Sequence, residues 1–88
     1  MSFSTKKYTI SLLINEVSSL KTSQVSSIDS FATTLSPRAG RNSAKFYALN
    51  QYLNGNLSSI FSGKGTFKSY GKTPRARVLN ALRNRKNV

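Results

Sequence analysis

Between residues 63 and 86 the sequence carries eight positive side chains and no negative one. Such a segment repels itself, so we expect it to lie at the surface and to leave most of the packing to the near-neutral part of the chain. Its first half holds three glycines and the aromatic residues Phe67 and Tyr70. Thr73-Pro74 then predicts the start of a helix, because threonine is a good N-cap and proline suits the first helical position. A flexible basic loop that leads into a basic helix is typical of a surface that binds phosphate groups, although charge alone also describes a solvated tail.

The charge is distributed unevenly along the 88 residues. Residues 1–36 carry three lysines and both acids, a net charge of +1, whereas residues 37–88 carry the other eleven positive charges and no acid. We therefore expect a single small domain over residues 1–88 that has two parts: a near-neutral helical hairpin in 1–36 and a basic half in 37–88 that faces nucleic acid. A domain of this size has a small core, and without cysteine it has no disulfide. Its net charge of +12 makes the compact chain repel itself, so an anionic partner should stabilise it.

Apolar residues recur at helical spacing in two stretches of the near-neutral part. Residues 9–20 place five of them on one face, which is the pattern of an amphipathic helix. Thr22 or Ser23 is expected to cap a second helix that runs to Leu35. The two helices predict an αα-hairpin whose apolar face is either core or a surface for neighbouring proteins.

Helices are also predicted in the basic half. A cap at Asn42 or Ser43 should begin a third helix that ends at Leu53, because Asn54-Gly55 is a strong helix stop.

The remaining residues predict short or basic elements. One further helical turn is expected over 57–61, followed by the basic loop and the basic helix over 74–86. These patterns predict an all-α fold of three to four helices with a basic glycine-rich loop and a basic C-terminal helix. The fold would be α+β if residues 65–70 formed a strand.

The sequence offers no set of groups for catalysis. It has no histidine and no cysteine, and its only acids, Glu16 and Asp29, fall on different predicted helices. General acid–base catalysis needs a titratable group poised near neutral pH, and metal sites need clustered ligands. Gly71-Lys72-Thr73 matches the end of a phosphate-binding P-loop, but Thr66 occupies the position of its first glycine. We therefore expect no enzyme activity, no metal and no cofactor.

A DNA-binding protein of the helix-turn-helix class is a competing interpretation. Residues 24–35 would be the supporting helix and residues 43–53 the recognition helix, with Asn50 and Gln51 as the best base readers. The ending Tyr52-Leu53-Asn54-Gly55 resembles the end of the recognition helix in bacterial repressors of this class. However, the connecting loop is longer than the usual three or four residues. The same basic charge would also suit a nucleoid or virion packaging protein, or a capsid subunit whose basic face neutralises an enclosed genome.

The favoured prediction is RNA binding within a ribonucleoprotein particle. RNA is often held by phosphate contacts and by stacking of unpaired bases on aromatic rings, which suits an aromatic residue between lysines. In composition the chain is similar to small ribosomal proteins, which implies a structural role in a ribosome-like particle. The residues expected to contact nucleic acid are Arg38, Arg41, Lys45, Lys64, Lys68, Tyr70, Lys72, Arg75, Arg77, Arg83, Arg85 and Lys86.

The sequence also bears on location. No apolar run approaches the roughly 18 residues that a transmembrane helix needs, so no membrane partner is expected. We expect an intracellular protein inside a nucleoprotein particle, with RNA rather than DNA as its main partner. Residues 1–20 are rich in serine and threonine and poor in acids, as in a weak mitochondrial targeting segment, so a mitochondrial location is the second expectation.

Overall fold

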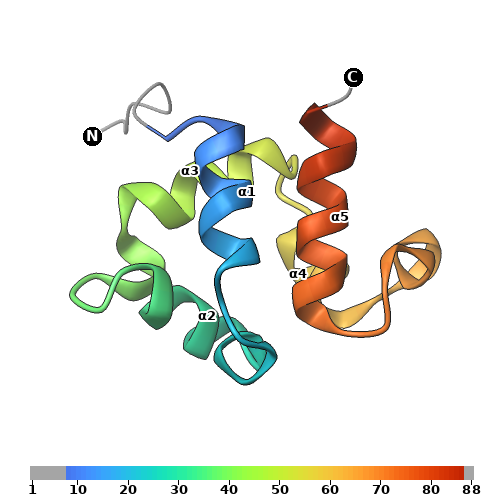
Figure 1. The fold of residues 1–88 in the computed structure, drawn as a ribbon, viewed down its shortest axis with the longest axis horizontal. Helices are drawn as coiled ribbons and strands as arrows, with labels where there is room; N and C mark the ends of the chain where they lie inside the picture. The colour runs from blue at the N-terminus through green and yellow to red at the C-terminus, as the bar shows by residue number, and fades with distance from the viewer. Residues whose placement is uncertain (1–7, 87–88) are drawn as a thin grey trace.

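We describe residues 8–86 of the protein, from a computed structural model. Over these residues the chain forms five α-helices and three short 3-10 helices, with no strand (Figure 1). The all-α prediction is therefore confirmed. The strand considered for residues 65–70 is wrong, because the segment winds into the 3-10 helix η4 (Gly65–Tyr70). Residues 1–7, where the stretch that resembles a targeting segment begins, lie outside the described residues.

The near-neutral part follows the predicted pattern with one correction. Its elements are α1 (Ile10–Ser18), η2 (Thr22–Val25) and α2 (Ile28–Leu35). The hydroxyl of Thr9 caps α1. The second predicted helix is divided, because Ser27 has an extended backbone and its hydroxyl accepts a hydrogen bond from the Ser30 N–H at 3.0 Å. Ser27 therefore begins α2, and neither Thr22 nor Ser23 does.

In the basic half the helix boundaries agree with the caps and stops in the sequence. The elements are η3 (Gly40–Asn42), α3 (Ala44–Tyr52), α4 (Leu57–Ser62), η4 and α5 (Pro74–Lys86). The Ser43 hydroxyl accepts from the Phe46 N–H at 2.9 Å, and the Thr73 hydroxyl accepts from the Ala76 N–H at 3.1 Å. Asn54-Gly55 ends α3 in the left-handed region, with φ values of 56° and 75°.

One hydrophobic core joins all five α-helices. Phe31 of α2 is fully buried, and its ring centroid lies 6.3 Å from that of Phe46 and 6.1 Å from that of Phe61. α5 contributes an apolar stripe of Val78, Leu79 and Leu82, in which Val78 and Leu82 are fully buried. The basic C-terminal helix is thus part of the core as well as of the surface.

α1 packs mainly against α5, so the first and last helices of the described chain lie side by side (Figure 1). Its apolar face is turned inward: Leu13 and Val17 are fully buried, and the three other apolar residues of that face are partly buried against the core. Most of this face therefore packs into the core, and contact with neighbouring proteins through it stays a prediction. The hairpin expected in residues 1–36 is also not the main packing unit, because α1 pairs with α5 rather than with α2.

Candidate nucleic-acid interface

Arg77 binds the C-terminal end of α4. Its Nε and Nη2 atoms donate to the carbonyl oxygens of Ile60 and Phe61, at 2.9 and 2.7 Å. Its Nη1 atom donates to the Gly71 carbonyl at 3.1 Å, so the guanidinium also holds the turn that precedes α5. Gly63 leaves room for this side chain, since a Cβ atom at residue 63 would lie 3.1 Å from the Arg77 Cζ. Each of the three nitrogens of this half-buried guanidinium therefore donates a hydrogen bond to the protein backbone.

Arg75 makes the equivalent contact at the end of α1. Its Nε donates to the Leu20 carbonyl and its Nη2 to the Ser18 carbonyl, both at 2.7 Å. These hydrogen bonds connect residues more than fifty positions apart in the sequence. They fix the first turn of α5 against the end of α1.

Lys45 binds the C-terminal end of α2. Its Nζ donates to the Leu35 carbonyl at 3.2 Å and to the Glu16 carboxylate at 3.0 Å. The last carbonyls of a helix lack partners within the helix, and its macrodipole favours a positive charge there. Lys45, Arg75 and Arg77, which we call the clamp cations, each fill this role. Their contact with nucleic acid stays a prediction from the sequence. Because their donors are directed at the protein, the candidate interface does not include them.

The other six predicted cations of residues 63–86 are exposed and make no hydrogen bond or ion pair within residues 8–86. We call the surface that they mark the η4–α5 face: Lys64, Lys68, Lys72, Arg83, Arg85 and Lys86. η4 packs against α5, so the loop and the helix lie on the same side of the molecule (Figure 1). No acid of the sequence falls in this segment, because Glu16 is on α1 and Asp29 is on α2. η4 and α5 therefore carry positive side chains and no negative one.

Two predicted cations lie elsewhere. Arg38 is exposed, and the Arg41 Nε forms an exposed ion pair with the Asp29 Oδ1 at 2.8 Å. Figure 1 shows that the connection between α2 and α3 lies at the opposite end of the molecule from η4. The structure thus does not bring Arg38 and Arg41 together with the η4–α5 face.

Tyr70 is held in place by α5. Its half-buried ring packs edge-on against Phe67, with centroids 5.5 Å apart and an interplanar angle of 84°. Its hydroxyl accepts a hydrogen bond from the Asn84 Nδ2 at 3.3 Å, and its carbonyl accepts one from the Asn80 Nδ2. The sequence reasoning missed both asparagines. The sequence does indicate that the two asparagines act together, because their i, i+4 spacing places both on the side of α5 that faces away from the apolar stripe.

The exposed side of α3 is polar but not basic. Asn50 and Gln51 are exposed, and the Gln51 Nε2 donates to the Tyr47 Oη at 2.9 Å. Lys45, the one cation of α3, is a clamp cation. Residues 36–43, which include η3, separate α2 from α3. This connection is longer than the turn of a helix-turn-helix motif.

Comparison with protein-family models, curated proteins and solved structures gives no match. Among residues 8–86, no helix combines the length and the apolar character needed to cross a bilayer. The same residues contain no group of three or more histidine, cysteine or acidic side chains that could hold a metal ion. A proposal about function therefore rests on the charge and geometry of the η4–α5 face.

Proposed function

We propose that the protein is a structural nucleic-acid-binding protein whose partner is RNA within a ribonucleoprotein particle. The observation that carries this proposal is the η4–α5 face, with six exposed cations, no acid and a tyrosine held beside it. The clamp cations already hold the helix ends, so folding does not account for the other six. Exposed like charges repel one another in the compact state, and binding to a polyanion relieves that repulsion.

RNA is favoured over sequence-specific reading of DNA by the surface of α3. A recognition helix needs base readers and nearby groups that hold the phosphate backbone. α3 offers the amides of Asn50 and Gln51, but its only cation is turned to the Leu35 carbonyl and Glu16. Binding to duplex DNA through the η4–α5 face is the competing function, and a direct comparison of the two nucleic acids separates them.

The test measures dissociation constants for a single-stranded RNA and for a DNA duplex over a range of salt concentrations. Six phosphate contacts on single-stranded RNA give a slope of log K against log salt near −4, at about −0.7 per contact. The variant Lys64→Gln/Lys68→Gln should make this slope shallower by about 1.4. The matched control is Arg38→Gln/Arg41→Gln, which removes the same number of positive charges at the other end of the molecule and should leave the slope unchanged.

Three results would overturn parts of the proposal. A wild-type slope shallower than about −2 would mean that most of the six cations do not face phosphate. Equal effects of the two double variants would mean that binding follows net charge and not the η4–α5 face. Tighter binding to the DNA duplex than to the RNA, at every salt concentration, would replace RNA by DNA as the partner.

A further inference from the structure

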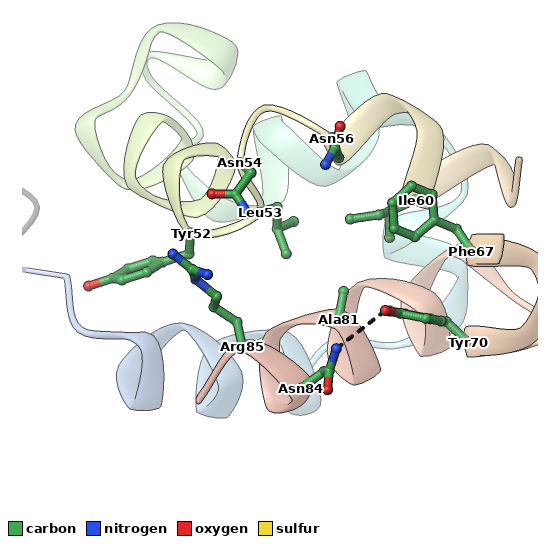
Figure 2. Close-up of a pocket in the computed structure, with 10 residues that line it drawn as sticks. All are labelled: Tyr52, Leu53, Asn54, Asn56, Ile60, Phe67, Tyr70, Ala81, Asn84 and Arg85. Carbon is green, nitrogen blue, oxygen red and sulfur yellow. Dashed lines mark hydrogen bonds between the residues drawn. The ribbon is translucent and has the colours of Figure 1, made fainter. Parts of the chain in front are cut away.

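A small pocket of about 160 Å³ opens between the α3–α4 corner and α5, directly beside the η4–α5 face (Figure 2). Leu53, Ile60 and Ala81 form its apolar floor, and all three are buried. Pockets that enclose drug-sized ligands usually measure about 300–1,000 Å³. This pocket therefore suits one planar ring and not a larger ligand.

The ends of the pocket carry aromatic rings and a cation. Phe67 and Tyr70 close one end, with the Tyr70 hydroxyl held toward the pocket by Asn84 (Figure 2). At the other end, the Arg85 side chain reaches from α5 to lie beside the ring of Tyr52 (Figure 2). Aromatic rings and guanidinium planes are the groups on which proteins stack unpaired bases.

The rim of the pocket carries side-chain amides. Asn56 and Asn84 lie on opposite sides of the opening, and Asn54 lies beyond the end of the Arg85 side chain (Figure 2). Asn56 stands at the start of α4 but makes no capping hydrogen bond with its side chain. An asparagine amide both donates and accepts hydrogen bonds, as the edge of a base does. The rim can thus pair with a base that enters edge-on.

We propose that this pocket takes up one unpaired base of the bound RNA, and that the guanidinium of Arg85 stacks on that base. This inference rests on the proposed function, because a base reaches the pocket only when the RNA backbone lies along the η4–α5 face. It adds a preference that the face alone lacks: cations recognise any phosphate backbone, whereas the pocket requires a base that is free of pairing and stacking.

The test compares two RNA hairpins that differ only by one unpaired adenosine in the stem. Wild-type protein should bind the bulged hairpin about tenfold more tightly than the fully paired one, the size of effect expected from stacking one base. Arg85→Gln and Asn56→Ala should each bring this ratio close to one. Arg83→Gln is the matched control: Arg83 is an exposed arginine of α5 outside the pocket, so its loss should weaken both hairpins equally and keep the ratio.

A second readout follows the base itself. Fluorescence of 2-aminopurine, placed at the bulge, should change on binding to wild type and to Arg83→Gln but not on binding to Arg85→Gln. If wild type binds both hairpins equally, or if Arg85→Gln and Asn56→Ala keep the tenfold ratio, the pocket does not take up a base and RNA binding through the face still stands. If neither hairpin binds with salt-dependent affinity, the proposed function itself fails.

Discussion

Arg77 should be more important for stability than for RNA binding. Replacing it with methionine keeps a similar aliphatic stem but removes the hydrogen bonds to the carbonyls of Ile60, Phe61 and Gly71. A hydrogen bond to a charged group contributes about 1.5–3 kcal/mol, and water can partly replace it at this half-buried site, so we expect Arg77→Met to cost about 3 kcal/mol. A chain of this length has a free energy of unfolding of about 4–13 kcal/mol, so the loss is a large fraction of the total.

The assay is thermal and urea unfolding of the free protein, followed by far-UV circular dichroism. At about 4–8 °C per kcal/mol, the Tm of Arg77→Met should fall by about 12–24 °C. Arg83→Met is the control, because Arg83 is exposed and without a protein partner among residues 8–86. The free energy of unfolding of this variant should stay within about 0.5 kcal/mol of the wild-type value. The reasoning is refuted if Arg77→Met unfolds like wild type while its RNA affinity falls as far as that of Arg83→Met.

Two further substitutions test local features of the fold. Ser43→Ala removes the hydroxyl that caps α3 at a buried position and should lower the free energy of unfolding by about 1 kcal/mol, measured in urea; no change would mean that water satisfies the Phe46 N–H. Gly71→Ala should lower the free energy of unfolding by about 1–3 kcal/mol, because a Cβ atom there would lie 2.7 Å from the Ala76 Cβ. The backbone at Gly71 is extended, so alanine adds crowding but no backbone strain. Wild-type stability of Gly71→Ala would show that the turn before α5 can shift freely.

Much of the fold could be predicted because its helix ends are encoded locally. Thr9, Ser43 and Thr73 each cap a helix by a hydrogen bond to an N–H three residues on, so a short window of sequence contains the signal. Local sequence does not identify the cap of α2 between residues 22 and 27, because several serines and a threonine there can all serve as caps. In the structure Ser27 is the cap, and local hydrogen bonds from the Lys21 N–H to the Gln24 side chain and from the Ser30 hydroxyl to the Gln24 carbonyl hold η2 apart from α2.

The candidate site was predictable in charge but not in detail. The sequence shows eight cations between residues 63 and 86, and nothing local separates Arg75 and Arg77 from Arg83 and Arg85. That separation depends on carbonyls at the ends of α1 and α4, far away in the sequence from α5. The pocket was also not predictable, because it exists only where the α3–α4 corner meets α5.

Because α5 packs against α1, the core cannot close until α5 has been synthesised. During translation, α1 to α4 leave the ribosome before α5, with the surface that α5 covers still exposed to solvent, and the domain folds as a unit only once α5 has emerged. A product that stops before residue 78 would lack Val78 and Leu82, two fully buried side chains. Such a product would be an unfolded chain open to proteolysis, and not a stable domain that has merely lost a basic tail.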